Sequence, residues 1–96
     1  MISTPTQNPN YFVSSDGFSL EVVMPHNFIY REEKREIDIY VEPLTSSIPF
    51  VIYINDEFKH WKPPYDAESI TTEKRSQIVE NIRKVFRFQG YEIDVI

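Results

Sequence analysis

The side chains of this chain that can do chemistry are few and lie far apart. Cysteine is absent, and the two histidines, His26 and His60, both lie beside predicted turns. A serine–histidine–aspartate set can be drawn from Ser46, His60 and Asp66, but no nucleophile-elbow motif positions a serine. The sequence therefore does not favour a hydrolase.

Metal and phosphate sites are disfavoured for similar reasons. Asp56, Glu57 and His60 lie close enough to gather at one hairpin end, but their spacing matches no zinc motif. No acidic loop resembles an EF-hand, and Gly17 and Gly90 are too few for a glycine-rich phosphate loop. We expect no cofactor and no metal, with the histidine in a solvated polar turn.

The charge balance argues against nucleic acid as the main partner. The net charge is −5, which disfavours contact with a phosphate backbone. Residues 71–90 hold five of the ten basic side chains but two of the fifteen acidic ones. This segregation indicates a basic helix that complements an acidic sheet and its own dipole, in preference to a phosphate contact. An acidic protein of this size suits a basic partner, or simply stays soluble.

Length and composition bound the class of protein. Ninety-six residues make one domain, and no apolar run is long enough to span a membrane. The segment 1–10 lacks the basic and apolar regions of a signal peptide, and we expect it to be a flexible arm. Residues 11–96 then form a single α+β domain. Without cysteine, a cytoplasmic location is the expectation.

The first regular element is a hairpin within residues 11–24. Asp16 and Gly17 suit the two central positions of a type I′ turn, where both residues need a positive φ. That register sets Val13 opposite Leu20 and places the larger side chains on one face.

Three later segments alternate apolar and polar side chains as half-buried strands do. They are residues 37–42, residues 50–54 and residues 91–96, the last with Tyr91, Ile93 and Val95 facing one way. The wholly charged run 31–36 fits either a turn between strands or one helical turn. After a turn at 55–56, we expect residues 58–61 to return as a short strand.

One helix is predicted from Thr71 onward, because the apolar period changes to 3.6 residues. Thr71 or Thr72 can cap its start, and Gly90 is well placed to end it. Its apolar stripe is Ile78, Val79, Ile82, Val85 and Phe86. The fold class is therefore α+β: a mostly antiparallel twisted sheet of about five or six strands, with one amphipathic C-terminal helix packed on one face, followed by a final strand.

One helix covers one face of such a sheet, so the other face is available to a partner. Asp38, Tyr40 and Glu42 are expected to share that face, with Tyr53 beside them. Tyrosine gives a large contact area at low entropic cost, and carboxylates attract a basic partner. An ordinary solvated sheet face explains the same residues equally well. A second acidic cluster, Asp56 and Glu57 with Asp66 and Glu68 near Trp61, is an alternative binding surface.

The stretch "HWKPPYDAESI" is the most distinctive part of the chain. The prolines favour an extended lead-in to the helix, and Trp61 is either a core residue or a contact residue. From Trp61 to the end, the chain resembles small immunity proteins of bacterial polymorphic-toxin and contact-dependent growth inhibition systems, specifically the immunity protein 74 family. The residues that carry the resemblance are Trp61, Pro63, Pro64, Ile70, Ile78, Asn81, Ile82, Gly90 and Tyr91.

The resemblance implies a cytosolic antitoxin that binds a cognate toxin domain, often a nuclease, and blocks it without catalysis. The leading hypothesis joins the two inferences: an acidic, tyrosine-bearing surface binds a basic toxin, and the protein itself is a monomer or a homodimer. A small homodimeric regulatory or structural protein that uses its exposed sheet face or edge is the alternative. An enzyme or small-ligand domain is the third, and it requires a defined apolar pocket.

Overall fold

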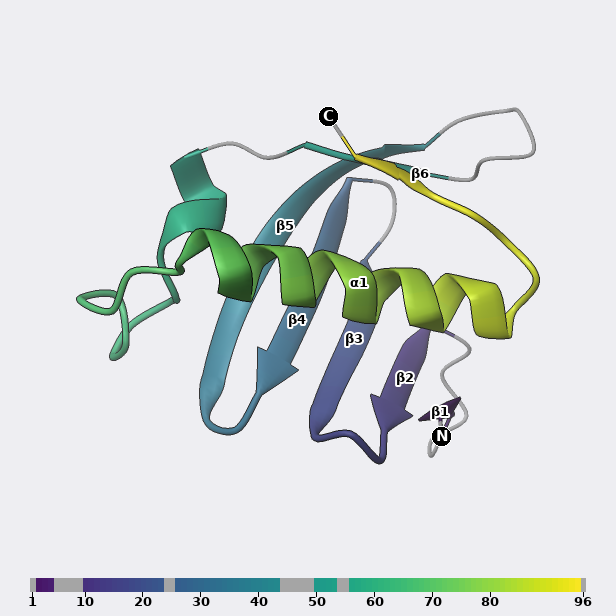
Figure 1. Ribbon diagram of the computed structural model, residues 1–96, viewed down its shortest axis with the longest axis horizontal. Coiled ribbons are helices and arrows are strands. Elements are labelled where there is room, and N and C mark those ends of the chain that lie inside the picture. The colour runs from purple at the N-terminus through teal and green to yellow at the C-terminus, as the bar shows by residue number, and fades with distance from the viewer. Residues whose placement is uncertain (1, 5–9, 24–25, 44–49, 54–55, 96) are drawn as a thin grey trace.

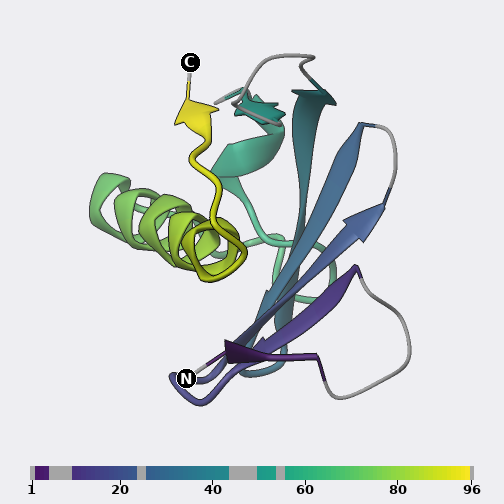
Figure 2. The same ribbon diagram turned by 90° about the vertical axis from the view of Figure 1, so that its right-hand side faces the viewer.

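A computed structural model describes residues 2–4, 10–23, 26–43, 50–53 and 56–95. Figure 1 shows a sheet with one helix lying across it, and Figure 2 shows that the helix covers a single face. The elements are β1 (Ile2–Ser3), β2 (Tyr11–Ser14), β3 (Phe18–Val23), β4 (Asn27–Glu32), β5 (Arg35–Pro43), β6 (Phe50–Ile52), the 3₁₀ helix η1 (Asp56–Lys59), α1 (Thr72–Phe88) and β7 (Asp94–Val95).

The predicted α+β architecture is confirmed. Within the described residues the strands lie in chain order from β1 to β7, and every neighbouring pair is antiparallel except β6 and β7, which are parallel. The described sheet has seven strands, and β1, only two residues long, is too short to show a period; β7 lies within the predicted final strand 91–96. Ile2 and Ser3 of β1 pair with Ser14 and Val13 of β2.

The register predicted for the first hairpin is wrong by one residue. Leu20 lies opposite Phe12, not Val13. The loop has three residues, with Gly17 at φ 98° in its last position and its N–H donating to the Ser14 carbonyl at 3.2 Å. The longer loop shifts the pairing by one position, so the Phe12 ring is buried and Val13 points to the other face.

The charged run 31–36 forms a turn between strands, the first of its two predicted alternatives. Glu32 pairs with Arg35, and Glu33 adopts a positive φ of 55° in the two-residue turn between them. Beyond this turn, β5 alternates as predicted: Ile37, Ile39 and Val41 are buried, and the residues between them are half-buried.

The helix prediction is confirmed at both ends. Thr71 is the N-cap, and its hydroxyl accepts a hydrogen bond from the Lys74 N–H at 3.1 Å. Gly90 follows the C-cap Gln89 with φ 89°, as expected of a residue that ends a helix. The five apolar residues of the predicted stripe are the buried residues of α1.

The core lies between α1 and the face of the sheet turned toward it, which we call the inner face. Phe28 of β4 contacts two other aromatic rings of this core. Its ring stacks on Phe86 of α1 with the centroids 5.5 Å apart, and it packs edge to face with Phe50 of β6 with the centroids 5.1 Å apart. Trp61 belongs to the same core and is 5% exposed. Of the two roles considered for this tryptophan, the structure supports the core residue.

Three expectations for the chain around α1 are wrong. The segment predicted to return as a strand is η1 followed by a single bridge between His60 and Ser69. The segment between those residues is a closed loop, held by the Ile70 N–H on the Lys59 carbonyl at 2.7 Å, in place of an extended lead-in. Tyr91 is 51% exposed and does not share the burial of Ile93, because its N–H bonds the helix end at the Phe86 carbonyl before β7 begins.

Candidate binding surface

The face of the sheet turned away from α1, which we call the outer face, brings four of the predicted site residues together. Asp38, Tyr40 and Glu42 alternate along β5 with the buried residues. The Tyr53 N–H donates to the Tyr40 carbonyl at 3.2 Å, and this bond sets the two rings edge to face, 5.6 Å apart. Whether the four bind a partner stays a prediction.

The carboxylate of Glu42 is held between two phenols. The Tyr40 hydroxyl donates to Oε1 at 3.0 Å, and the Tyr53 hydroxyl donates to Oε2 at 3.1 Å. These bonds to a carboxylate raise the pKa of both tyrosines, since each phenol is stabilised in its neutral form. The His26 ring stacks nearly parallel on Tyr40, with the ring centroids 6.0 Å apart. We call His26, Tyr40, Glu42 and Tyr53 the Glu42 cluster.

Asp38 has a different environment, because a lysine from a distant loop already neutralises it. Lys62 Nζ lies 3.3 Å from Asp38 Oδ2 and 2.9 Å from Glu36 Oε2. The backbone N–H of Lys62 also donates to the Glu36 carbonyl at 2.8 Å and fixes the loop against β5. Hydrogen bonding to this ammonium group is the main cause that lowers the pKa of Glu36.

The charges continue in alternation toward the other strands. Arg31 Nε lies 2.6 Å from Glu36 Oε1, and its Nη1 lies 3.3 Å from Glu21 Oε1. We call Glu21, Arg31, Glu36, Lys62 and Asp38 the ion-pair row. By contrast, no lysine or arginine among the described residues lies within ion-pair distance of Glu42. The unneutralised negative charge of the outer face is therefore concentrated at the Glu42 cluster.

The second acidic cluster is divided. The backbone of Asp56 and Glu57 opens η1, and their side chains lie outside the described part of the structure. Arg35 binds Glu68 through its Nε and Nη2, which donate to the carboxylate at 2.9–3.2 Å, while Asp66 is exposed. This engagement leaves Asp66 as the one described acidic side chain of that cluster with an open carboxylate.

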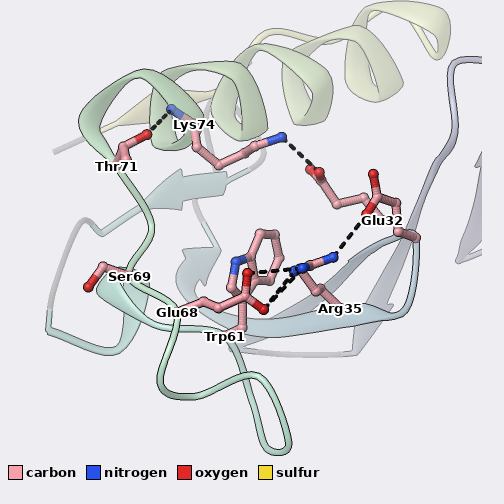
Figure 3. Close-up of a pocket in the computed structure, with 8 residues that line it drawn as sticks. Glu32, Arg35, Trp61, Glu68, Ser69, Thr71 and Lys74 are labelled. Atoms are coloured by element: carbon pink, nitrogen blue, oxygen red, sulfur yellow. Dashed lines mark hydrogen bonds and ion pairs between the residues drawn. The ribbon is translucent and has the colours of Figure 1, made fainter.

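Arg35 and Lys74 border a hollow of about 310 Å³ at the start of α1 (Figure 3). Arg35 also binds Glu33 at 2.9 Å and lies over the Tyr65 ring at 4.6 Å from its centroid. Lys74 Nζ binds Glu32 at 2.8 Å. The charged groups around this hollow form ion pairs that link the helix, the closed loop and the β4–β5 turn. Because these groups are paired with one another, none of them is available as a catalytic acid or base.

A polar chain that the sequence did not reveal lies next to this hollow. The Tyr30 hydroxyl donates to Glu32 Oε1 at 2.8 Å and accepts from Asn81 Nδ2 at 3.0 Å. Burial raises the pKa of this tyrosine above its usual range. Tyr30 occupies an inward position of an alternating strand, which is a signal of burial but not of its partners.

The catalytic and metal candidates lie partly outside the described residues, which include neither Ser46 nor the side chains of Asp56 and Glu57. No group of three or more histidine, aspartate and glutamate side chains there is placed to hold a metal ion. His60 is exposed, and Ser46 lies outside the described residues. The helices that the structure describes lack the length and apolar content needed to cross a membrane.

The structure describes a small α+β protein with a charged outer sheet face. Comparison with protein families identifies the class: a sequence model of the family described as immunity protein 74 matches residues 23–96. The chain belongs to the immunity protein 74 family. The matched region covers β4 to β7 and includes the whole Glu42 cluster. No curated protein and no solved structure matches the chain.

Proposed function

We propose that this chain is a cytoplasmic, non-catalytic immunity protein that binds a cognate toxin domain through the outer face of its sheet. The toxin surface is basic, as that of a nuclease domain is. Membership of an immunity protein family supports a partner of this class. The observation that carries the proposal is the carboxylate of Glu42, which accepts hydrogen bonds from Tyr40 and Tyr53 and has no lysine or arginine of the described chain beside it.

The aromatic and acidic composition of the cluster suits the centre of an interface. Tyrosines are enriched among residues that dominate binding energy, because they bury a large area with few rotatable bonds. A carboxylate that faces a basic surface accelerates encounter with it. Asp38 is a weaker candidate than the sequence indicated, since Lys62 already offsets its charge.

The test begins with the toxin. We expect a neighbouring reading frame to encode a large secreted protein whose C-terminal domain stops growth when it is expressed alone, and co-expression of this chain to restore growth. Recovery of growth without a complex in pull-down, or no recovery, contradicts the proposed function.

The binding face is tested with two charge reversals of equal size. Glu42→Arg is expected to weaken toxin binding by about 2 kcal/mol or more, roughly 30-fold in Kd, chiefly through slower association at low salt. Glu73→Arg is the matched control, because Glu73 is exposed in the first turn of α1, on the opposite side of the sheet. Surface plasmon resonance at two salt concentrations measures both variants. If Glu73→Arg weakens binding and Glu42→Arg does not, the interface lies on the helical side.

A further inference from the structure

We infer that the Glu42 cluster is a receptor for a guanidinium group, so that the residue it takes from a partner is arginine and not lysine. This inference rests on the proposed function for the identity of the partner, but its chemistry is a property of this chain alone. The cluster recognises the planar guanidinium group with its parallel N–H donors, and not the compact ammonium group of lysine.

The first argument is the hydrogen bonding of the carboxylate. Each oxygen of Glu42 accepts one phenol hydroxyl, Oε1 from Tyr40 and Oε2 from Tyr53. An ionised carboxylate offers about four acceptor positions, so each oxygen keeps about one more. Two acceptor positions, one on each oxygen, match the two parallel N–H groups of a bidentate guanidinium. The phenols also fix the plane of the carboxylate, which reduces the entropy lost on binding.

The second argument is the aromatic surface beside the carboxylate. Tyr40 and Tyr53 stand edge to face, and His26 lies flat against Tyr40. A guanidinium stacks on an aromatic face while its N–H groups stay in the plane of the carboxylate, and an ammonium group cannot do both.

The third argument is an example within the same chain. Arg35 lies 4.6 Å from the centroid of the Tyr65 ring and binds the carboxylate of Glu68 through two nitrogens at 2.9–3.2 Å. That unit is a glutamate, a tyrosine ring and an arginine. The Glu42 cluster supplies the glutamate and the rings, and no arginine of the described chain completes it.

The ion-pair row explains why this site stands out from the rest of the outer face. Glu36 and Asp38 already contact Lys62, and Glu21 contacts Arg31. An incoming cation must compete with those groups along the row, whereas no lysine or arginine of the described residues pairs with Glu42. A single arginine of a partner is therefore expected to bind more favourably at the Glu42 cluster than at the ion-pair row.

The experiment titrates the isotopically labelled protein with ethylguanidinium chloride and, separately, with ethylammonium chloride at constant ionic strength. The readouts are the NMR signals of the side-chain carboxyl carbon of Glu42 and of the Tyr40 and Tyr53 rings. We expect saturable shifts, with an apparent Kd about threefold or more lower for ethylguanidinium than for ethylammonium. The Glu42→Gln variant is expected to lose the shifts, and the Tyr40→Phe/Tyr53→Phe double variant to lose the preference.

Glu73 is the internal control, since it is an exposed carboxylate on α1 with no tyrosine hydroxyl bound to it in the described structure. Equal responses of Glu42 to the two cations, or the same preference at Glu73, overturn the inference.

The toxin experiment separates the inference about the guanidinium receptor from the proposed function. If Glu42→Gln leaves toxin binding intact while the guanidinium preference stands, the proposed binding face is wrong and the receptor remains. If toxin binding requires Glu42 but the titration shows no preference, the receptor is wrong and the face remains.

Discussion

Lys62 joins the closed loop to the sheet and lowers the pKa of Glu36. Its ammonium group binds Glu36 at 2.9 Å, and this bond, followed by the contact with Arg31, lowers the pKa of the Glu36 carboxyl. A carboxyl whose pKa is lower in the folded than in the unfolded chain stabilises the fold above the unfolded pKa. That stabilisation is lost as the pH falls through the lowered folded pKa.

The Lys62→Met variant is expected to raise the pKa of Glu36 toward its ordinary value, because the largest cause of the lowering is removed. Glu36 then contributes less stability above its unfolded pKa, so the variant loses less stability as the pH falls than the unmodified protein does. Carbon-detected NMR of the Glu36 carboxyl across pH 2–7 measures the shift (the range brackets the usual carboxyl pKa of about 4). Lys84→Met, which removes an exposed lysine of α1, is the control. An unchanged Glu36 titration in Lys62→Met contradicts the assignment.

For single residues, the sequence could predict the face of the sheet on which a side chain lies, but not the side chains with which it pairs. The alternation of β5 is a local property, so it correctly grouped Asp38, Tyr40 and Glu42 on one face. It could not separate Asp38 from Glu42, because Lys62 reaches Asp38 across 24 residues of chain that only the folded loop brings back. The contact between Tyr53 and Glu42 depends in the same way on the pairing of β6 with β5.

Among the elements, α1 was predictable because its signals are local. A threonine cap, an apolar stripe of 3.6-residue period and a terminal glycine each act within a turn or two of the helix. The register of the β2–β3 hairpin could not be predicted in the same way. Loops of two and of three residues both accommodate a glycine, and they differ by one position in how they pair the two strands. The burial of Phe12 beside Leu20 decides between them, and burial is a property of the whole sheet.

The cap of α1 provides a prediction at the scale of the element. Thr71→Ala is expected to lower the free energy of unfolding by about 1 kcal/mol, because the Lys74 N–H loses its acceptor. Thr72→Ala is the matched control: it removes the same side chain one residue later, inside the helix, where alanine is the better helix former. Urea denaturation followed by far-UV circular dichroism measures both. Equal losses in the two variants contradict the role of Thr71 as the cap.

For the whole molecule, the core is one cluster that joins the inner face, α1 and the loop after η1. Trp61 packs into this cluster from the loop and is 5% exposed, so its removal leaves a large cavity. Trp61→Ala is expected to cost about 3–5 kcal/mol of stability. Phe88→Ala is the comparison, since Phe88 is an aromatic residue with 59% exposure, and we expect it to cost far less.

Chemical denaturation monitored by far-UV circular dichroism gives both free energies without using tryptophan emission. A Trp61→Ala protein of unchanged stability that no longer binds the toxin contradicts the core assignment and makes Trp61 a contact residue. The closed form of the loop could not be predicted from the sequence, because no local pattern marks His60 and Ser69 as a pair.

The order of the elements also matters while the protein is being made. All described strands except β7 end by residue 52, whereas the helix that covers the inner face begins at residue 72. Synthesis runs from the N terminus, so the nascent chain carries a nearly complete apolar sheet before its cover has emerged. An uncovered apolar sheet favours self-association. The yield of native protein is therefore sensitive to events between the release of β6 and the docking of α1, an interval in which chaperones compete with aggregation.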